Sequence, residues 1–561
     1  MANHGWTPLL ALALGLLAAG CMMAADDSQK LPCSDSLDCP AGWICNTDSG
    51  QCREPSSFDS IVDFELTPKP GSSAAPTQLA SVDLRRMDDL LEIELDRAVP
   101  FGGWVHNDGP GVPGSLQLSR TPAFDGRRLN WNLQVAEDGT FDAELAYNAA
   151  DDQLNHYQAL FRPANRTDFP QLAASGIQLA ASGMTDASLK YPAYTPSDQL
   201  DQQQTLLSVR LRVLESEAFP HPVSGILVEG ITDQGLRTNL VAPDAQGWVV
   251  LELPVTLRPG GQEMLRPQSL TLLLRPAEAN MRLPTVTTAE QMLVRLDPAA
   301  PDLGTFYVGD VPDSQAVTGV VTDSGGHPVT DCQLRFSAAA IGNGRYDKTI
   351  ETDTEGYFST TLPAGEYLVL VVPDPLAEVR LHAVNDVQIG PDAQQLSISL
   401  PPRLSLSGRV VDRDGAAVAG VLVRAERHAD WNGLDDGVTR TFDGSSGEDG
   451  RFELLVDTGS YTLILNPPPA SGLPRARLPN LVVSTNDIEL EQLRTQLAAP
   501  EIIQGHLFNP GGSPVCGATV DVYRSDATSA ELIGQSVSGT DSRGCNGSYS
   551  VVVPATAAEH N

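Results

Sequence analysis

The feature that most constrains this chain is a pattern of strands and turns that occurs three times in its C-terminal part. The copies begin at residues 317, 406 and 503 with an alternating apolar segment, and each continues through a turn that contains glycine. A second glycine turn then precedes an aromatic residue, as in residues 353–358 (Asp-Thr-Glu-Gly-Tyr-Phe). Glycine supplies the positive φ that tight turns need, and alternating apolar side chains are typical of strands with one buried face. The pattern therefore predicts a series of small modules built from β-strands.

The second copy carries the pattern most completely. Gly408, Val410 and Asp412 open it, and residues 447–452 (Gly-Glu-Asp-Gly-Arg-Phe) follow. This order resembles the carboxypeptidase regulatory-like domain, a transthyretin-like Greek-key β-sandwich with the hallmark G-x-V-x-D-x-x-G-x-P-V-x-G-A followed by T-D-x-x-G-x-F. The resemblance covers roughly residues 315–561 and says little about function, because one fold hosts many activities. It implies sandwich modules that serve as spacers or binding accessories, at residues 313–400, 401–499 and 500–561.

The third copy differs from the other two at its end. The first two copies finish with an alternating strand that starts with tyrosine, at residues 367–372 and 461–465. The third copy reaches residues 549–554 and the chain then ends at residue 561 without such a strand. We therefore expect the module at residues 500–561 to be truncated.

Residues 58–312 carry only weak echoes of the pattern, at residues 137–141 and 223–228. Alternating apolar segments at residues 90–95, 205–213 and 269–274 still indicate half-buried sheets. Two sandwich-like units are expected, at residues 58–200 and 201–312, with one larger β domain as the alternative. A chain of 561 residues is too long for one core, and its 42 prolines and 49 glycines suit short strands joined by turns. The predicted class is all-β, with tandem Greek-key β-sandwich modules.

The N-terminal residues have the pattern expected of an export signal. Residues 9–19 form an apolar run that is shorter than the ~20 residues a membrane-spanning helix needs, so residues 1–20 are expected to be a signal peptide. Residues 17–21 (Leu-Ala-Ala-Gly-Cys) resemble the lipobox of bacterial lipoproteins. The resemblance implies a lipid anchor on Cys21, and Met22 after it is similar to the pattern sorted to the outer membrane. The expected location is the outer membrane, facing the periplasm or the cell surface.

Four cysteines follow within residues 21–57, a cysteine-rich module and linker. They are Cys33, Cys39, Cys45 and Cys52. Zinc sites usually pair their cysteines at shorter spacing, and export favours oxidation, so two disulfides are expected over a metal site. Three connectivities remain open. The spacing resembles short cysteine-rich modules near the N-termini of surface lipoproteins in myxobacteria and related predatory bacteria.

Three further cysteines lie in the repeated modules. Cys516 and Cys545 fall in the third copy, where a disulfide between them is expected if their Cα atoms are close enough. Cys332 is then left unpaired, and its alternating surroundings favour a buried small apolar side chain over a reactive thiol.

The net charge of −35 makes nucleic acid an improbable partner, because affinity for polyanions comes from clustered Lys and Arg. Divalent cations or basic partners are compatible with it, although a solvated acidic surface is the simpler interpretation. The acidic segment most suggestive of a site is residues 430–437, followed by Asp443, Glu448 and Asp449. Its spacing does not match a calcium loop, so a solvated loop is expected over a calcium site. Trp431 in this loop is either a sugar-stacking side chain or partly buried.

No catalytic motif is present. No histidine begins His-x-x-Glu or His-Glu-x-x-His, and neither Gly-x-Ser-x-Gly nor Gly-Lys occurs. The one G-x-G-x-x-G match, at Gly109, Gly111 and Gly114, contains two prolines and precedes a strand pattern, so it is interpreted as a turn. No catalytic residue, cofactor or metal site is therefore predicted.

Three functional hypotheses remain. The favoured one is a non-enzymatic, lipid-anchored envelope protein that acts as a multi-domain scaffold or adhesion protein. The alternatives are a glycan-binding surface lipoprotein and a hydrolase with an atypical carboxylate site, since paired carboxylates leave little trace in a sequence. The expected partners are the membrane, through the lipid anchor, and envelope proteins or surface glycans.

Overall fold

The computed structural model describes most of residues 61–555, together with the short strands Ile44–Asn46 (β1) and Gln51–Arg53 (β2). Within 61–555 the description leaves out residues 85–89, 108, 122–128, 193–206, 258–263, 266, 279–281, 294–295, 297–300, 432–433, 436, 485–487, 490–494, 526–529 and 542–543. The predicted signal peptide, Cys21, Cys33 and Cys39 lie outside the described residues. Among the described residues there is no helix whose length and apolar character would let it cross a bilayer.

The predicted fold class is confirmed: the described chain is almost entirely strand and forms tandem β-sandwiches. Module III, residues 314–400, shows the plan. One sheet has the order β25-β22-β28, with β25 Tyr357–Pro363, β22 Ser314–Asp323 and β28 Gln394–Leu400. The other has the order β24-β23-β26-β27, with β24 Gly344–Glu351, β23 Gln333–Ile341, β26 Gly365–Val372 and β27 His382–Ile389. The first and last strands pair parallel and the other pairs are antiparallel.

Module IV, residues 404–496, repeats this plan. The counterpart of the three-stranded sheet joins β34 Arg451–Val456 and β29 Leu404–Val411. Two short strands, β37 Ile488–Glu489 and β38 Thr495–Gln496, pair parallel with β29 in place of one longer strand. Its four-stranded sheet joins β33 Arg440–Ser445, β30 Leu422–Arg427, β35 Gly459–Asn466 and β36 Ala476–Val483. Two short paired strands, β31 Asp430–Trp431 and β32 Leu434–Asp435, lie in the acidic insertion, and a 3-10 turn, η6 Pro469–Ser471, follows β35.

Module I, residues 97–192, has the same topology. One sheet has the order β9 Thr140–Tyr147, β6 Arg97–His106 and β12 Met184–Lys190. The other joins β8 Asn130–Val135, β7 Gly114–Thr121, β10 His156–Pro163 and β11 Leu172–Gln178, with a 3-10 turn, η3 Asp152–Asn155, before β10. This second sheet is extended by β16 Val255–Leu257 and β17 Met264–Leu265, which come from the following module.

Module II, residues 207–307, has a three-stranded sheet of its own with the same plan. It joins β15 Trp248–Glu252, β13 Ser208–Leu214 and β21 Asp302–Tyr307. Its second sheet joins β14 Ile226–Thr232 and β18 Ser269–Pro276 with two short strands, β19 Val286–Thr287 and β20 Gln291–Met292. Where module III has β24, residues 237–241 run beside β14 with isolated bridges from Arg237 and Val241.

Module V is built from both ends of the described chain. Its three-stranded sheet joins β44 Ser548–Pro554, β39 Pro500–Phe508 and β5 Leu91–Glu94, and β5 pairs parallel with β39. Its four-stranded sheet joins β41 Ala530–Val537, β40 Thr519–Ser525, β3 Ile61–Thr67 and β4 Thr77–Asp83. The short strands β42 Thr540–Asp541 and β43 Gly544–Cys545 pair beside it. Residues from both segments share one core.

This arrangement corrects the expectation that residues 500–561 form a truncated module. The strands that the third copy lacks are supplied by β3, β4 and β5, which occupy the places of β26, β27 and β28 in module III. It also corrects the assignment of residues 58–95 to the same unit as residues 97–192. Because module V contains both a segment before module I and a segment after module IV, the chain closes into a ring of five modules.

A shared irregularity shows that β3 and β4 are true equivalents of the strands they replace. The fifth and sixth strands of modules I, III, IV and V each pair with a bulge, after Tyr157, Tyr367, Tyr461 and Val62 respectively. Opposite each bulge lies a residue with positive φ, namely Gly176, Asp386, Asn480 and Ser81. A bulge bends its strand and increases its twist, so all four modules bend their sheet at the same place.

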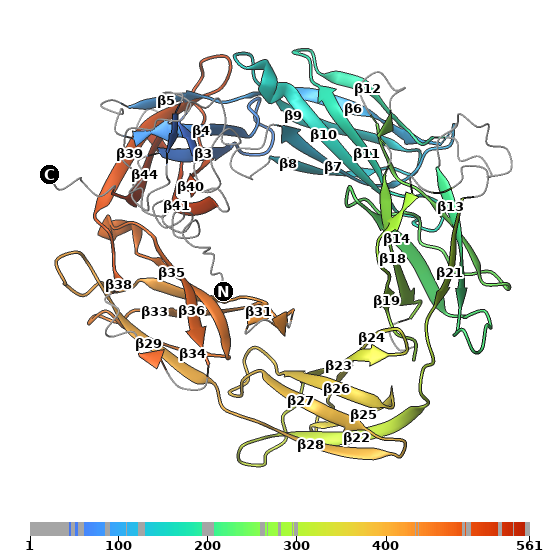
Figure 1. Ribbon diagram of the computed structural model, residues 1–561. Coiled ribbons are helices and arrows are strands. Elements are labelled where there is room, and N and C mark those ends of the chain that lie inside the picture. The colour runs from blue at the N-terminus through green and yellow to red at the C-terminus, as the bar shows by residue number, and fades with distance from the viewer. Residues whose placement is uncertain are drawn as a thin grey trace, which may run out of the picture.

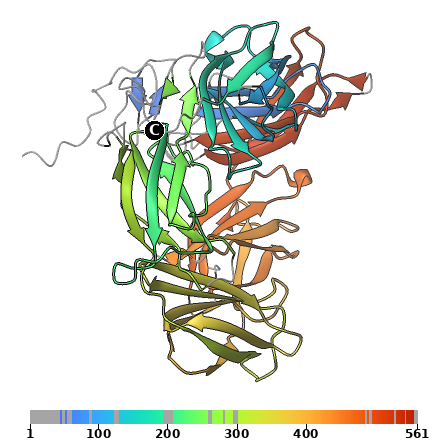
Figure 2. The ribbon, with the colours of Figure 1, turned by 90° about the vertical axis from the view of Figure 1, so that its right-hand side faces the viewer.

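The ring is visible in Figure 1, where module V, with blue and red strands side by side, lies between modules I and IV. In that view the three-stranded sheets, here called rim sheets, lie on the outer side, and the other sheets line the inner side. Turned by 90°, the modules are staggered in depth, so the ring is puckered (Figure 2).

The glycine of the repeated motif has a steric reason. Gly103, Gly319 and Gly505 lie on the first strand opposite an aromatic residue of the fourth strand, and Gly319 pairs with Phe358. A Cβ at Gly319 would lie 2.4 Å from Cζ of Phe358 and 2.4 Å from the carbonyl oxygen of Leu396 on the parallel strand. Module II has Leu211 opposite Val249 instead, and β21 shifts register at this point, with Gly304 at positive φ.

Candidate functional site

One surface position recurs around the ring, where the first strand of each rim sheet crosses the start of the fourth strand. We call this the rim pair, and its side chains face away from the core. From module I to module V the rim pairs are Trp104/Thr140, Arg212/Trp248, Val320/Tyr357, Arg409/Arg451 and His506/Ser548. Three of the five pairs therefore place a large aromatic side chain at the same outward position.

The three aromatic side chains differ in their surroundings. Trp104 is 45 % exposed and contacts the ring of His106 at a centroid distance of 4.4 Å. Trp248 is covered by two guanidinium groups, of Arg210 at 5.1 Å and of Arg212 at 5.8 Å from the ring centroid. Tyr357 is 53 % exposed. Cation–π contacts therefore cover Trp248, whereas the ring of Tyr357 is open to solvent.

Beside Tyr357 the surface of module III is hollowed, with a volume of about 510 Å³. The hollow is lined by Thr318, Gly319, Glu351, Thr352, Asp353, Tyr357, Phe358, Ser359 and Gln395. Oδ1 of Asp353 accepts hydrogen bonds from the backbone N–H groups of Glu355 and Tyr357, at 2.9 and 2.8 Å, and so fixes the turn that presents Tyr357. The result is an aromatic face beside hydroxyl, amide and carboxylate groups.

Module V is hollowed at the equivalent place, with a volume of about 440 Å³. Its lining includes Gly505 and Tyr549, the counterparts of Gly319 and Phe358, together with His506 and Leu90. The hydroxyl of Tyr549 donates to the carbonyl oxygen of Leu91 at 3.3 Å, and burial raises the pKa of this tyrosine. Leu90 and Leu91 belong to the N-terminal segment, so this hollow exists only in the closed ring.

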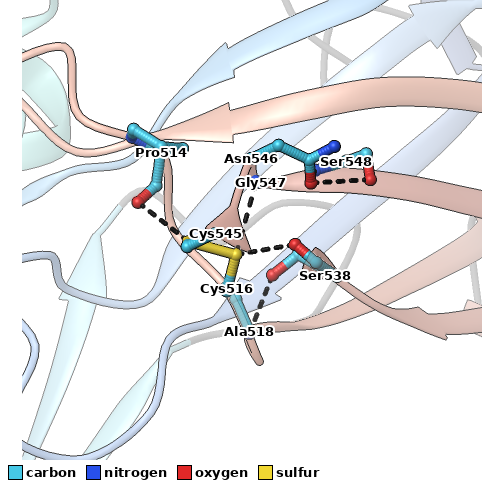
Figure 3. Close-up of a disulfide and its surroundings, with 9 residues drawn as sticks. Pro514, Cys516, Ala518, Ser538, Cys545, Asn546, Gly547 and Ser548 are labelled. Atoms are coloured by element: carbon cyan, nitrogen blue, oxygen red, sulfur yellow. Dashed lines mark hydrogen bonds between the residues drawn. A yellow bond between two sulfur atoms is a disulfide. The ribbon is translucent and has the colours of Figure 1, made fainter. Parts of the chain in front are cut away.

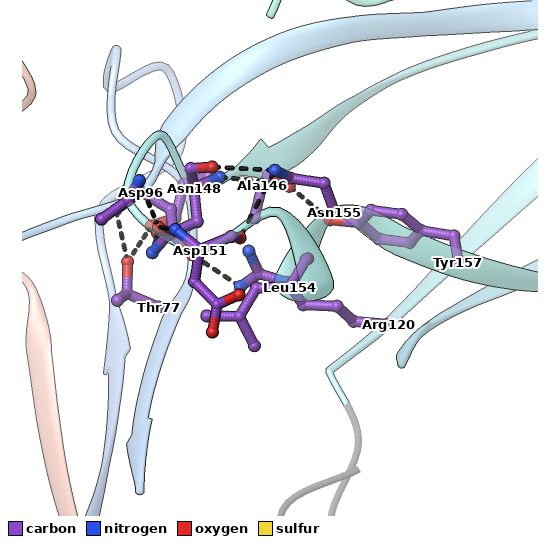
Figure 4. A network of polar contacts seen from close by, with 11 residues as sticks. Thr77, Asp96, Arg120, Ala146, Asn148, Asp151, Leu154, Asn155 and Tyr157 are labelled. Carbon is purple, nitrogen blue, oxygen red and sulfur yellow. Dashed lines mark hydrogen bonds and ion pairs between the residues drawn. The ribbon is translucent and has the colours of Figure 1, made fainter. Parts of the chain in front are cut away.

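Three of the buried carboxylates, those of Asp96, Glu229 and Asp457, lie at module junctions. Between modules V and I, Asp96 pairs with Arg120 at 2.5 Å, accepts a hydrogen bond from Asn148 at 2.8 Å, and donates its backbone N–H to Thr77 at 2.7 Å (Figure 4). Arg120 also donates to the carbonyl oxygen of Leu154. Both charges are nearly inaccessible to solvent, so this group ties the two modules together and is not open to a substrate.

Glu229 makes the corresponding contact between modules I and II. It pairs with Arg166 of module I and, within module II, with Arg237 at 2.9 Å and Arg275 at 3.8 Å. Burial alone would raise the pKa of Glu229, but the hydrogen bond from Arg166 and the three guanidinium charges lower the pKa below its ordinary value. Glu229 is therefore held ionised.

Asp457 serves the junction between modules III and IV. It is fully buried, accepts the backbone N–H of Leu381 at 2.9 Å, and pairs with Arg440 at 2.8 Å and Arg403 at 3.9 Å. Arg440 also donates to the carbonyl oxygen of Pro373 in module III. A small apolar cluster, Leu370, Leu381 and Val438, covers the same junction.

Glu252 is the exception among the carboxylates. It lies at the end of β15, where the chain leaves module II to add β16 to the sheet of module I. Burial, and then the charge of Asp168, raises the pKa of Glu252 to about 7. Its Oε2 is buried and has no hydrogen-bond partner among the described residues. Burial, and then the charge of Glu252, raises the pKa of Tyr191.

Of the predicted cysteine sites, the structure describes one completely. Cys516 and Cys545 form a disulfide with Cα atoms 5.7 Å apart, which ties the turn before β40 to β43 (Figure 3). Cys45 and Cys52 are opposite each other in the β1–β2 pair, and their side chains lie outside the described residues. Cys332 is free and fully buried, and burial, followed by the charge of Asp331, raises its pKa to about 11.

The acidic segment of module IV shows no convergence of carboxylates in its described part. Asp443 forms a two-contact ion pair with Arg424 at 2.8 and 3.2 Å, and Asp449 caps its own turn near Arg451. The side chains of residues 430–436, Trp431 included, lie outside the described residues. Within the described residues no group of three or more His, Cys, Asp or Glu side chains is placed to hold a metal ion.

Sequence reasoning missed the rim pairs and the junction carboxylates. Neighbouring side chains of a strand point to opposite faces of the sheet, so Tyr357 points outward if Phe358 points into the core. The outward orientation of Tyr357 could therefore have been predicted from the sequence. The hollow beside it depends on Gln395 of the parallel strand β28, which local patterning cannot align.

Comparison with known proteins assigns no family. No family model matches the chain. Halomucin of Haloquadratum walsbyi is 26% identical over 152 residues, which is 27% of this chain, and the chain spans 2% of the length of halomucin. At those values the similarity shows neither a family nor a function.

Similar solved structures include three bacterial proteins. The Streptococcal ancillary pilin is 12% identical, with 51% of this chain and 98% of that chain covered at a TM-score of 0.19. The Bacillus anthracis TIE protein is 10% identical (73% and 79% covered, TM-score 0.15), and BcpA, the major pilin subunit of Bacillus cereus, is 10% identical (55% and 100% covered, TM-score 0.14). At these TM-scores the similarities carry no argument about function.

Proposed function

We propose that this protein is a non-enzymatic binding scaffold of the bacterial envelope, anchored through a lipid on Cys21. The observation that carries the proposal is the closure of the ring, in which β3, β4 and β5 complete the C-terminal module. Closure brings the N-terminal and C-terminal strands into one module, module V. The five rim sheets then face outward around the ring. Cys21, in the lipobox-like segment, precedes β3 by 40 residues (61 − 21). A lipid on Cys21 would therefore connect the membrane to the ring at module V.

The junctions support a scaffold whose modules keep their relative orientation. Asp96, Glu229 and Asp457 each bridge two modules through buried or half-buried ion pairs, and β16 of module II continues a sheet of module I. Between modules II and III, backbone hydrogen bonds link Thr285 and Arg345 in both directions, at 2.6 and 2.9 Å. Breaking a buried ion pair leaves an uncompensated charge, which makes independent motion of the modules costly.

These ion pairs also remove three carboxylates from the candidates for an atypical hydrolase site. A glycosidase needs two carboxyl groups that flank a substrate in an accessible site. The deeply buried carboxylates of Asp96 and Asp457 are each neutralised by arginine, and so is that of Glu229.

The anchoring part of the proposal is tested by metabolic labelling with a clickable palmitate analogue, followed by separation of inner and outer membranes. We expect label on the wild type in the outer-membrane fraction and none on the Cys21→Ala variant. A matched variant, Cys332→Ala, removes a buried thiol without touching the lipobox and should keep the label. Label that persists in Cys21→Ala, or that never attaches to the wild type, would overturn the anchor.

A further inference from the structure

Resting on the proposed scaffold function, we propose that the hollow of module III binds a neutral glycan, with the ring of Tyr357 as its stacking platform. The hollow combines an aromatic face, 53 % exposed, with polar side chains on three strands: Thr318 on β22, Ser359 on β25 and Gln395 on β28. A pyranose ring presents C–H groups on one face and hydroxyl groups around its edge. The first suit an aromatic face and the second suit hydroxyl and amide groups.

The polar groups of the hollow are free to bind a ligand. Within the described residues, the side chains of Thr318, Ser359, Gln395 and Glu351 have no hydrogen-bond partner in the protein. One carboxylate oxygen of Asp353 accepts hydrogen bonds from the backbone N–H groups of Glu355 and Tyr357. These bonds hold Tyr357 in place in the absence of a ligand. A site that is already ordered loses less conformational entropy on binding.

The negative charge of the hollow favours neutral glycans over acidic ones. The nine lining residues include Glu351 and Asp353 and no lysine or arginine, and the whole chain carries a net charge of −35. A uronic or sialic acid carboxylate would meet like charge without a cationic partner, which disfavours its binding. A neutral sugar hydroxyl instead donates well to a carboxylate. The chemistry therefore points to neutral hexose or N-acetylhexosamine units.

The second observation is that the position is repeated. Module V is hollowed at the same strand positions, and module I places the exposed Trp104 at its rim pair. Module II has Trp248 there, but Arg210 and Arg212 cover its ring. Module IV has Arg409 and Arg451 there, and both contact Asp449, so this module is not a counterpart. Weak sites spaced around a closed ring gain avidity on a polymer that spans more than one of them. A surface polysaccharide therefore fits the ring better than a single short sugar.

The test uses the purified full-length protein in a zwitterionic detergent that has no sugar headgroup. Isothermal titration with chitotetraose, cellotetraose and maltotetraose is compared with titration of tetragalacturonate. We expect at least one neutral probe to bind and the acidic probe not to bind. Tyr357→Ala should raise the dissociation constant at least about tenfold. Tyr357→Phe, which keeps the ring face, should bind as the wild type does.

The matched control is Leu455→Ala, because Leu455 is 52 % exposed on β34, the strand of module IV equivalent to that of Tyr357. It should leave binding unchanged, and circular dichroism confirms that each variant is folded. Equal binding of a neutral probe by wild type and Tyr357→Ala, or no binding of any neutral probe by the wild type, would overturn the glycan site. Either result would leave palmitate labelling unaffected, so failure of the site is distinguishable from failure of the envelope scaffold.

Discussion

At the junction between modules I and II, the carboxyl group of Glu252 is expected to make stability depend on pH. The pKa of Glu252 is raised to about 7 by burial and by Asp168, so the folded state favours its protonated form. The stability that protonated Glu252 contributes is therefore fully present below the ordinary glutamate pKa. This contribution is lost as the pH rises from there through about 7. The sign is opposite to that of Glu229, whose lowered pKa makes it stabilising when ionised.

We expect the wild type to lose about 1–2 kcal/mol of stability at this junction between pH 5 and pH 8, after allowance for partial exposure of the group. Glu252→Gln should abolish this loss, because the amide carries no charge at either pH. Calorimetric melting at the two pH values measures the effect, with Glu144→Gln as the control, since Glu144 is an exposed carboxylate on β9. A wild-type transition that does not weaken towards pH 8 would contradict the assignment.

Asp457 provides the second test at the level of one residue. Asp457→Asn keeps the size of the side chain and leaves Arg440 and Arg403 without a buried counter-charge. Loss of one partner of a buried pair costs about 3–5 kcal/mol. Urea unfolding followed by limited proteolysis should locate the loss at the junction of modules III and IV. The exposed pair Arg424–Asp443 offers the control: Asp443→Asn should cost less than about 1 kcal/mol, and equal costs for the two variants would refute the distinction.

At the scale of strands, the repeated glycine governs how closely the rim sheets pack. Gly319→Ala should destabilise module III by about 2 kcal/mol, because the new Cβ meets both Phe358 and the carbonyl oxygen of Leu396. Phe358→Leu in the same chain should recover only part of this loss, since the backbone contact stays. A double-mutant cycle by urea unfolding measures the coupling. Full recovery would show that the aromatic ring alone requires glycine.

Much of the element structure could be predicted from the sequence. The alternating strands and glycine turns correctly indicated β-sandwich modules, because their side chains pack within about a hundred residues of one another. The completion of module V could not be obtained in that way. Strand β3 pairs with β40, more than 450 residues away, and Val62 stands where the equivalent strands of modules III and IV have tyrosine. The alternation of Val62, Phe64 and Leu66 with acidic residues was the available signal.

The candidate site was harder to predict than the fold. The carboxylates of the acidic segment of module IV are close together in sequence, yet Asp443 is paired with Arg424 in the structure. The hollow at Tyr357 draws on three strands of one sheet and carries no local motif. Cross-strand neighbours depend on register, which the sequence of one strand does not specify.

At the scale of the whole molecule, closure joins an N-terminal and a C-terminal segment into one core. Repeat proteins need special ends, because a terminal module otherwise exposes an unpaired face. In this chain the strands of the N-terminal segment and those of the C-terminal segment form one complete module. Its shared core includes Phe64, Leu66, Val520 and Val551. The closed arrangement follows from strand pairing and does not depend on the angles between modules.

The most direct test of closure is a cross-link between paired residues of β3 and β40. Glu65 and Asp521 are opposite each other in the register, so Glu65→Cys with Asp521→Cys should form a disulfide within one chain. Non-reducing electrophoresis and peptide mass spectrometry should show a monomer that migrates differently from the reduced protein and contains the linked pair. Each single variant serves as a control and should not shift. A double variant that stays reduced under oxidising conditions, or that forms only covalent multimers, would contradict closure of the ring by its own N-terminal strands.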